Sequence, residues 1–497
     1  MTVCGGFLML PGMGNRICAG GRVIGVLVWL ALCGCGDDGG AAPEVPDAAA
    51  PDAASAGLAA QLEAIDGVLA VTEQLTSKPG YRRFELVIDQ PVDHAAPGAS
   101  GPRFMQQVTL MHRDAAAPMV LTSTGYDNYL GDSLSEPTGL LRGNQLAVEH
   151  RYFGASRPQP ADWSYLTVAQ AAADHHRVVT LLRPLYAADW VSTGLSKGGM
   201  TAILHRRFYP DDVTATIAYV APFSLAVGDE RYHDFFAGLD PDPDGCPARV
   251  REFQRQALER RDSLEAVVAS DLSGSRFERV GGVGPALEYG VYEFEWTFWQ
   301  YLGAARCDEV PDESASDRVF AEFLATVDAV GALSDSSLER FGPYYYQSVT
   351  ELGYPSVPAA HLADLARYDY EAALFELIPA GAEADPSSYQ PSAMRDVVDW
   401  IERDAERMVF LYGAQDPWTA GAVELDPMTA AAREVYVVIA PDSNHRSKIG
   451  DLSAADQGLV MDALTGWVSS AGALGAVSQA APSAPAAQLP GYGLRPR

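Results

Sequence analysis

Short apolar runs alternate with segments of helical period through the first half of the chain. Runs with the length of buried strands lie at residues 84–88, 104–111, 119–123, 146–149, 190–193 and 215–220. Between the fourth and fifth runs, residues 168–186 have the spacing of a long amphipathic helix. Strands that alternate with helices are typical of βαβ units, so the pattern predicts an α/β fold with a largely parallel sheet.

The alternation is interrupted from residue 224 to residue 390. Helical patterns at 250–269 and 317–330 flank an aromatic-rich segment at 289–301. Strand-like runs return at 408–412 and 435–439, and residues 459–468 have the pattern of a closing helix. We interpret the chain as one α/β domain, made of residues 58–223 and 391–470, with a large, mainly helical cap at 224–390 inserted after the sixth strand.

The two ends of the chain lack the large apolar side chains that a core needs. Residues 36–57 are mostly Ala, Pro, Asp and Gly, and residues 471–497 are rich in Ala, Pro and Ser. Such segments bury too little apolar surface to offset the entropy lost on folding. We therefore expect a disordered tether at 36–57 and a disordered tail at 471–497.

Residues 1–35 have the pattern of a bacterial signal peptide. Two arginines precede an apolar run at 23–32, which is too short to span a bilayer and has the length of a signal-peptide core. The following Leu32-Cys33-Gly34-Cys35 resembles a lipobox, in which the last cysteine is lipidated. We expect an outer-membrane or cell-surface lipoprotein anchored through Cys35, and ordinary cleavage with free secretion is the alternative.

Composition and charge limit the ligands. The net charge of -30 argues against nucleic acid, which requires a basic surface to displace counterions. No Cys/His cluster has metal-ligand spacing and no Gly-rich phosphate loop occurs, so we expect neither a metal nor a cofactor. The membrane is expected as a partner only through the lipid anchor, and the oligomeric state stays open.

Two cysteines, Cys246 and Cys307, remain outside the leader and the lipidation candidate. The compartment of an exported protein is oxidising, which favours a disulfide between them over two free thiols.

Gly194-Leu195-Ser196-Lys197-Gly198 matches the pattern Gly-x-Ser-x-Gly. Gly and Ser are common, so a chance match is the alternative. A predicted strand precedes this pentapeptide and a helical segment follows it, as in the turn that exposes the nucleophile of an α/β-hydrolase. This context favours the α/β-hydrolase fold, with Ser196 as a catalytic nucleophile.

A serine nucleophile needs an imidazole to accept its proton and a carboxylate to orient that imidazole. The hydrolase fold supplies them in the chain order Ser, acid, His. Of the four histidines after Ser196, one lies in the helix after the motif and two lie in the predicted cap. The fourth, His445, lies in a polar loop after the strand at 435–439 and is the predicted base.

Asp416 follows the strand at 408–412, one strand before the histidine loop, where the acid belongs. An Asp-Pro turn without catalytic role is the alternative interpretation. Asp399, Asp426 and Asp442 are rival acids, but the first two lie in helical or irregular sequence and Asp442 shares the loop of His445. We favour Asp416.

The oxyanion hole is expected to use two backbone N–H groups. One belongs to Lys197, directly after the nucleophile, and the other to Gly125 or Tyr126, in the loop after the third strand. We expect the ammonium of Lys197 to be a solvated or ion-paired surface group rather than a catalytic one.

Four segments, one of which contains the Ser196 motif, resemble those of a known protein family. They are Gln-Pro-Val-Asp-His at 90–94, Val-Glu-His-Arg-Tyr-Phe-Gly at 148–154, Gly-Leu-Ser-Lys-Gly-Gly-Met-Thr at 194–201 and Tyr-Gln-Ser-Val-Thr-Glu-Leu-Gly-Tyr at 346–354. Together they resemble the bacterial secreted prolyl tri/tetrapeptidyl aminopeptidases, distant relatives of prolyl carboxypeptidase and dipeptidyl peptidase II. The resemblance implies peptide substrates, shortened from a free N-terminus, often after proline, through an acyl-enzyme on the serine.

An exopeptidase of this kind must bind the ammonium of the substrate, which calls for a carboxylate in the cap. Glu288, Glu293, Glu295 and Glu351 are candidates, and each could equally be a solvated acid on a helix. Dipeptidyl peptidase II has an aspartate before its Tyr-Gln pair. This chain has Tyr345 there, so the resemblance does not extend to dipeptide release.

Other residues have a structural interpretation. The aromatic residues Tyr292, Trp296, Phe298 and Trp299 could line a proline pocket, but packed core is the commoner role of such a helix. We expect the ionisable run 149–151 to form structural ion pairs and hydrogen bonds. An esterase or lipase on the same triad, and a surface-anchored binding protein with a relic triad, are the alternative functions.

Overall fold

The computed structural model describes residues 53–96, 101–243 and 245–469. The predicted signal peptide at 1–35, with Cys35, and the predicted tail at 471–497 lie outside these residues, as does most of the predicted tether. Within the described ranges, no helix combines the length and apolar character of a membrane span.

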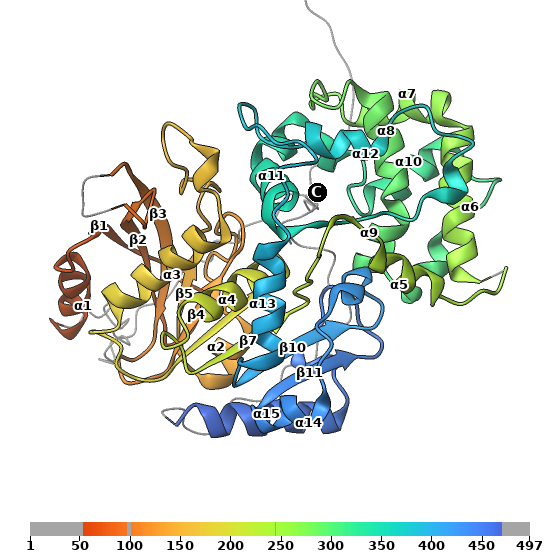
Figure 1. Cartoon of the computed structure of the whole chain (residues 1–497). Helices are drawn as coiled ribbons and strands as arrows, with labels where there is room; N and C mark the ends of the chain where they lie inside the picture. The colour runs from red at the N-terminus through yellow and green to blue at the C-terminus, as the bar shows by residue number, and fades with distance from the viewer. Residues whose placement is uncertain (1–52, 97–100, 244, 470–497) are drawn as a thin grey trace, which may run out of the picture. The chain divides into compact units, whose positions relative to one another are not determined.

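The described residues form a nine-stranded sheet of order β1-β2-β3-β5-β4-β6-β7-β10-β11 (Figure 1). The pairs β1/β2, β2/β3 and β3/β5 are antiparallel, and every pair from β5/β4 to β10/β11 is parallel. The strands are β1 (Val68–Gln74), β2 (Arg82–Pro91), β3 (Arg103–His112), β4 (Met119–Ser123), β5 (Asn144–Val148), β6 (Trp190–Leu195), β7 (Ala215–Tyr219), β10 (Met408–Gly413) and β11 (Val435–Ala440). This is the predicted α/β-hydrolase architecture.

Helices cover both faces of the sheet. Along β10, Val409 and Leu411 pack with α15 (Ala454–Trp467), whereas Phe410 and Tyr412 pack with α4 (Lys197–Phe208) and α13 (Ser392–Arg403). Side chains of a strand alternate between its faces, so α15 lies on one face and α4 and α13 on the other. The remaining helices of this part are α1 (Ala53–Glu63), α2 (Glu136–Leu141), α3 (Val168–Leu182) and α14 (Pro427–Ala432).

Two features at the start of the domain differ from the prediction. Residues 53–57, expected in the tether, begin helix α1, because alanine favours helix and Leu62 supplies a buried contact. Strand β1 was not predicted, because its apolar residues 68–71 lack the alternation of a half-buried strand and most of its side chains are exposed at the edge of the sheet. With β1 counted, the cap follows the seventh strand in chain order, not the sixth.

The cap has an aromatic core of its own and lies between β7 and α13, green to cyan in Figure 1. Its parallel strands β8 (Val227–Asp229) and β9 (Tyr354–Pro355) pair with each other and join its first and last parts. Its helices are α5 (His233–Ala237), α6 (Cys246–Glu259), α7 (Arg261–Asp271), α8 (Val283–Tyr292), α9 (Phe294–Tyr301), α10 (Asp317–Ala325), α11 (Asp335–Gln347) and α12 (Tyr370–Ala373).

Two details of the cap bear on the predictions. The helical pattern at 250–269 is two helices, α6 and α7, which meet at Arg260 without a glycine or proline to mark the break. The predicted disulfide is confirmed, because Cys246 and Cys307 are bonded with their Cα atoms 5.5 Å apart. It fastens the start of α6 to the 3-10 helix Ala304–Glu309.

Candidate active site

Ser196 lies in a strained turn between β6 and α4. Its backbone has φ 55° and ψ -125°, outside the regions that a residue with a Cβ atom ordinarily occupies. Such strain persists only where surrounding packing enforces it, and it is typical of functional sites. The predicted strand, sharp turn and helix are therefore present, and the serine has the conformation expected of a nucleophile.

Two glycines make this turn possible. A Cβ atom on Gly194 would lie 2.2 Å from the carbonyl carbon of Gly198, where β6 and α4 touch. A Cβ atom on Gly198 would lie 2.3 Å from the carbonyl oxygen of Ser123, at the end of β4. Both distances are far inside van der Waals contact, so only glycine lets the strand, the helix and the β4 loop meet.

The predicted acid and base are in contact. His445 Nδ1 lies 2.6 Å from Asp416 Oδ2, with Asp416 fully buried and His445 2% exposed. Asp416 also accepts a hydrogen bond of 3.2 Å from the backbone N–H of Trp418. Among the rival acids, Asp399 pairs with Arg403 along α13 and Asp426 caps the start of α14, so each has a local structural role.

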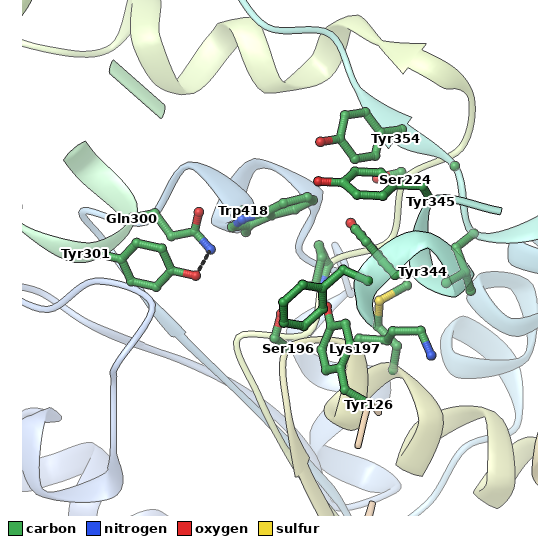
Figure 2. Close-up of a pocket in the computed structure, with 15 residues that line it drawn as sticks. Tyr126, Ser196, Lys197, Ser224, Gln300, Tyr301, Tyr344, Tyr345, Tyr354 and Trp418 are labelled. Atoms are coloured by element: carbon green, nitrogen blue, oxygen red, sulfur yellow. Dashed lines mark hydrogen bonds between the residues drawn. The ribbon is translucent and has the colours of Figure 1, made fainter. Parts of the chain in front are cut away.

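Ser196 faces a narrow pocket of about 40 Å³ between the hydrolase domain and the cap. Figure 2 shows Tyr344, Tyr345, Tyr354 and Trp418 around the space next to Ser196. The full lining is Tyr126, Ser196, Lys197, Met200, Pro222, Ser224, Gln300, Tyr301, Phe341, Tyr344, Tyr345, Leu352, Gly353, Tyr354 and Trp418. The aromatic residues of α11 and the β10 loop were not predicted to line the site; the density of tyrosines at 344–346 was the available signal.

The ring of His445 lies near this pocket. Its centroid is 6.1 Å from the ring of Tyr301 and 6.4 Å from that of Trp418, and the backbone N–H of His445 donates to the Gln300 carbonyl at 3.1 Å. Ser196 Oγ forms no hydrogen bond with any described residue. The contact between serine and histidine is thus open in this state, as catalytic hydrogen bonds often are before substrate binds.

Two N–H groups next to Ser196 have no acceptor. Neither the N–H of Lys197 nor that of Tyr126 makes a hydrogen bond within the described part of the chain. Gly125 has φ 75° and packs against the first turn of α4, so a Cβ atom on this residue would lie 2.4 Å from Gly198 N. Of the two predicted donors in this loop, Tyr126 is the one whose N–H belongs to the peptide held against α4.

The expectation for the Lys197 ammonium is wrong. Lys197 is 2% exposed, and its Nζ donates to the carbonyl oxygen of Gly125 at 2.8 Å. The ammonium also lies over the rings of Tyr126 and Phe153, at 5.6 and 5.1 Å from their centroids. Burial holds the pKa of Lys197 well below its usual range. The side chain is internal because the β4 loop and Phe153, distant in sequence, fold over it.

The candidate ammonium-binding acids have different surroundings. Glu288 pairs with Arg261 and accepts hydrogen bonds from two backbone N–H groups. Glu295 Oε1 lies 2.9 Å from Arg251 Nε, and burial raises the pKa of Glu295 to about 7 although Arg251 opposes this. Glu351 accepts a hydrogen bond of 2.7 Å from Val168 N–H at the start of α3, and burial raises its pKa to about 7.

Glu293 borders a second and larger cavity. This cavity, of about 690 Å³, lies in the cap, and Tyr354 lines both it and the Ser196 pocket. Glu293 accepts a hydrogen bond from Tyr370. Burial raises the pKa of Tyr354 and of Tyr344, and the nearby negative charge of Glu293 raises both further. Of the four candidates, Glu293 is therefore the one next to the tyrosines of the Ser196 pocket.

The aromatic segment at 289–301 is mainly packed core, as favoured from the sequence over a proline pocket. Trp296, Phe298 and Trp299 are buried in the aromatic cluster of the cap, and Trp296 packs edge-on against Trp418, with ring centroids 5.0 Å apart. Tyr292 belongs to the same cluster and also lines the larger cavity.

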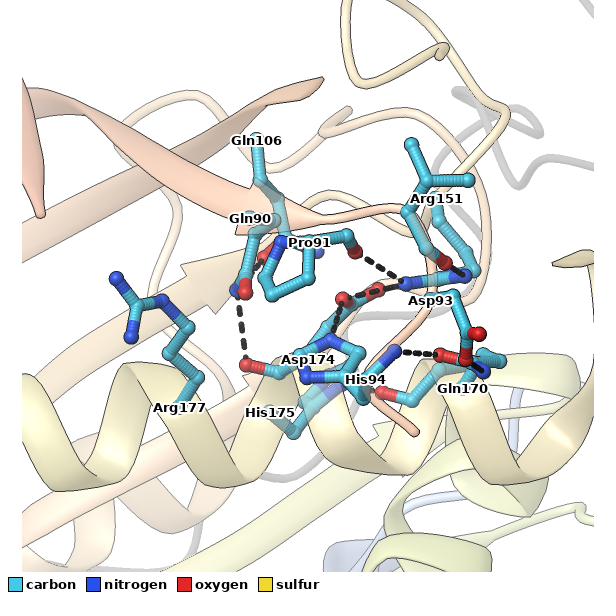
Figure 3. A network of polar contacts seen from close by, with 12 residues as sticks. Gln90, Pro91, Asp93, His94, Gln106, Arg151, Gln170, Asp174, His175 and Arg177 are labelled. Carbon is cyan, nitrogen blue, oxygen red and sulfur yellow. Dashed lines mark hydrogen bonds and ion pairs between the residues drawn. The ribbon is translucent and has the colours of Figure 1, made fainter. Parts of the chain in front are cut away.

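The ionisable run at 149–151 has the expected structural role. Arg151 Nε and Nη2 donate to Asp174 at 2.7 and 2.8 Å, and His94 contacts the same carboxylate, as Figure 3 shows. Glu149 accepts hydrogen bonds from the backbone N–H groups of Asn128, Ala155 and Ser156, each at 2.9 Å. These contacts tie the loop after β5 to the loop after β4, to α3 and to His94.

Metal chemistry has no ready ligand set among the described residues, where no group of three or more His, Cys, Asp or Glu side chains is arranged to hold an ion. The site itself holds a serine in a strained turn at the end of a parallel strand, and the buried histidine–aspartate pair lies near Tyr301 and Trp418, which line the pocket of that serine. This arrangement of residues supports hydrolysis through a serine nucleophile on an α/β-hydrolase scaffold. The protein is thus a serine hydrolase of the α/β-hydrolase class.

The chain belongs to the family described as PS-10 peptidase S37, whose model matches residues 51–493. Over 433 residues it is 38% identical to the prolyl tri/tetrapeptidyl aminopeptidase of Streptomyces mobaraensis, a match that covers 86% of this chain and 88% of that protein. The family resemblance read from the sequence is confirmed, and the enzyme is a serine peptidase.

Two solved structures show a weaker likeness. The proline iminopeptidase of Mycobacterium smegmatis is 13% identical, with a TM-score of 0.35, over 80% of this chain and all of that one. A peroxisomal alpha-beta-hydrolase of Saccharomyces cerevisiae is 11% identical, with a TM-score of 0.35, over 82% of this chain and 92% of that one. Family membership accordingly rests on the sequence matches.

Proposed function

We propose that this serine peptidase is an aminopeptidase that releases tri- or tetrapeptides from free N-termini, with a preference for cleavage after proline. The observation that carries the proposal is the strained Ser196 in a tyrosine-lined pocket formed by the hydrolase domain and the cap. The named activity of the Streptomyces relative supports the substrate class.

In the proposed mechanism, His445 takes the proton of Ser196 Oγ as that oxygen attacks the scissile carbonyl. Asp416 accepts a hydrogen bond from Nδ1–H of His445, which leaves Nε2 as the base and stabilises the imidazolium that forms. The tetrahedral oxyanion accepts hydrogen bonds from the N–H groups of Lys197 and Tyr126, both without another acceptor in the described structure.

His445 then returns the proton to the leaving amine, which is the rest of the substrate. The short N-terminal peptide stays bound to Ser196 as an acyl ester. Water attacks this ester with His445 again as base, which regenerates the serine. Both half-reactions use the same two N–H groups, so loss of either donor slows acylation and deacylation alike.

Glu293 is the proposed acceptor for the ammonium of the substrate. Glu293 borders the large cap cavity, and Tyr354, which its charge reaches, lines both that cavity and the Ser196 pocket. Phe341, Tyr345 and Trp418 supply an apolar wall for a proline side chain next to Ser196. All four candidate acids have hydrogen-bond or ion-pair partners, and Glu293 is chosen for its place on this cavity.

The decisive experiment compares blocked and free substrates. We expect the protein to cleave the anilide of a tripeptide that ends in proline, and not to cleave the same substrate with an acetylated N-terminus. A fluorophosphonate should label Ser196. Ser196→Ala should abolish both. Turnover of acyl esters without any peptide cleavage would favour an esterase, and a folded protein that never labels would favour a binding protein.

We also propose export with a lipid on Cys35. The lipobox-like sequence and the disulfide between Cys246 and Cys307, which forms in oxidising compartments, support this. Palmitate should label the protein in cells and should not label Cys35→Ser, and unlabelled protein in the medium would favour free secretion.

A further inference from the structure

We propose that the buried ammonium of Lys197 is a positioning group that fixes the oxyanion hole. It holds the Gly125 carbonyl and thereby aims the N–H of Tyr126 at the oxyanion. The inference rests on the proposed acyl transfer through Ser196. It assigns to the Lys197 side chain a task separate from that of its backbone N–H.

The geometry follows from one planar peptide. The carbonyl of Gly125 and the N–H of Tyr126 belong to the same trans peptide unit, so they point in opposite directions. Lys197 Nζ binds the carbonyl end at 2.8 Å, which leaves the N–H end directed away from the ammonium. That N–H has no acceptor in the described part of the chain, and Tyr126 lines the Ser196 pocket.

The next peptide along is held as well. The carbonyl oxygen of Tyr126 accepts hydrogen bonds from His150 N–H at 2.9 Å and from Thr124 Oγ1 at 2.8 Å. The hydrogen bonds that orient Tyr126 therefore come from backbone and hydroxyl donors on its C-terminal side and from Lys197 on its N-terminal side, where Gly125 also packs closely against α4. Removal of Lys197 takes away the hydrogen bond to the Gly125 carbonyl, so the peptide that carries the Tyr126 N–H is less tightly oriented.

A purely structural role does not require a charge at this position. Burial of an ammonium costs several kcal/mol unless it is compensated, and Lys197 forms no ion pair with any described residue. The faces of Tyr126 and Phe153 and the Gly125 carbonyl are its compensation. A methionine fills similar space without this cost, so the amine is explained by what it donates to.

The cap reaches the same group. A cavity of about 10 Å³, enough for about one water molecule, is lined by Lys197, His150 and, from α11, Gln347. Gln347 Oε1 is buried without a hydrogen-bond partner among the described residues. A water in this cavity would join Gln347 of the cap to Lys197, so the cap lies next to the ammonium that holds the Gly125 carbonyl.

The test compares Lys197→Met with wild type. Because one oxyanion-hole donor is worth about 10²–10³ in kcat, we expect kcat to fall about 100-fold with KM within about threefold. Affinity for a peptide aldehyde, whose adduct occupies the oxyanion hole, should fall by the same factor, while affinity for the product peptide stays unchanged. The control is Thr201→Val, which removes a buried hydrogen bond of 2.8 Å one turn along α4 and is expected to change stability but not this ratio.

A folded Lys197→Met enzyme with kcat within threefold of wild type overturns the proposal, as does an equal loss of affinity for product and aldehyde. If Lys197→Met does not fold, Lys197→Gln, whose side chain is one bond shorter, is tested by the same criterion. The two losses should again be equal, though smaller. If wild type labels with fluorophosphonate but cleaves no peptide, the proposed function fails. The labelling rates of the same variants then still test whether Lys197 positions the Tyr126 N–H.

Discussion

His445 Nδ1 and Asp416 Oδ2 lie 2.6 Å apart in a site where neither side chain meets solvent appreciably. A carboxylate accepts but does not donate when ionised, so Nδ1 carries the hydrogen and Nε2 is left as an acceptor. The two residues come from the loops after β11 and β10, which are neighbouring parallel strands. Their contact therefore follows from the sheet order.

Replacement of Asp416 by Asn tests this relationship. The amide fits the same space but can hold His445 in the other tautomer, with the hydrogen on Nε2. We expect kcat to fall about 10⁴-fold with little change in the melting temperature. Steady-state kinetics with a thermal melt of both proteins checks it. An Asp416→Asn enzyme within tenfold of wild type would show that another acid serves His445.

Glu293→Gln tests the proposed ammonium site. Loss of a charge-assisted contact of about 1.5–3 kcal/mol should lower kcat/KM for free N-termini by about 10- to 100-fold and leave fluorophosphonate labelling unchanged. Glu371→Gln is the matched control, because Glu371 is an exposed acid on the same cavity. Equal effects of the two substitutions would mean that the general charge of the cavity matters, and not Glu293.

The sequence was sufficient for the central sheet because β4 to β7 and β10 are buried on both faces and each carries a short apolar run, although small polar residues interrupt some of them. It was insufficient for β1, a mostly exposed edge strand whose short apolar start at 68–71 does not alternate, and for the break at Arg260, which no helix-breaking residue marks. Elements were predictable where burial is imposed by the fold as a whole.

The same division applies to the site. Chain order alone predicted the contact of His445 with Asp416, since the hydrolase topology brings those two loops together. The burial of Lys197 was not predictable, because Phe153 and the Gly125 loop that enclose it are distant in sequence. A choice among the four acids of the cap likewise needed the cavities, which depend on packing between helices that sequence does not reveal.

Gly198→Ala should disrupt the turn at Ser196. The added methyl group would sit 2.3 Å from the Ser123 carbonyl oxygen, so strand β4 and helix α4 must separate. We expect a loss of about 3 kcal/mol in unfolding free energy and no fluorophosphonate labelling. Gly458→Ala in α15 is the control, because its methyl group meets nothing within 4 Å, and it should gain up to about 1 kcal/mol. Urea unfolding of both variants gives the comparison, and wild-type labelling by Gly198→Ala would contradict the steric argument.

Removal of the disulfide should weaken the cap. The bond closes a loop across a sequence separation of 61 residues. In the chain-entropy model, a loop of this length contributes about 4 kcal/mol. We expect the double variant Cys246→Ser/Cys307→Ser to unfold at lower urea concentration than wild type, and wild type with reductant to match it. A shift of less than about 1 kcal/mol would mean that packing of α6 alone holds the loop.

His175 should make stability depend on pH on the acid side. Its ring is buried, with Nε2 3.0 Å from Ser123 Oγ, and burial, followed by repulsion from His205, lowers its pKa to about 4. The unfolded chain binds this proton near pH 6.5, and the folded protein resists it until about pH 4. The contribution of His175 to the free energy of unfolding is thus complete above pH 6.5 and falls by about 3 kcal/mol as the pH decreases to 4. His175→Gln keeps a neutral polar side chain and removes this titration. Urea unfolding at several pH values should therefore give a shallower decline for the variant than for wild type, and identical slopes would mean that His175 is protonated in the folded protein.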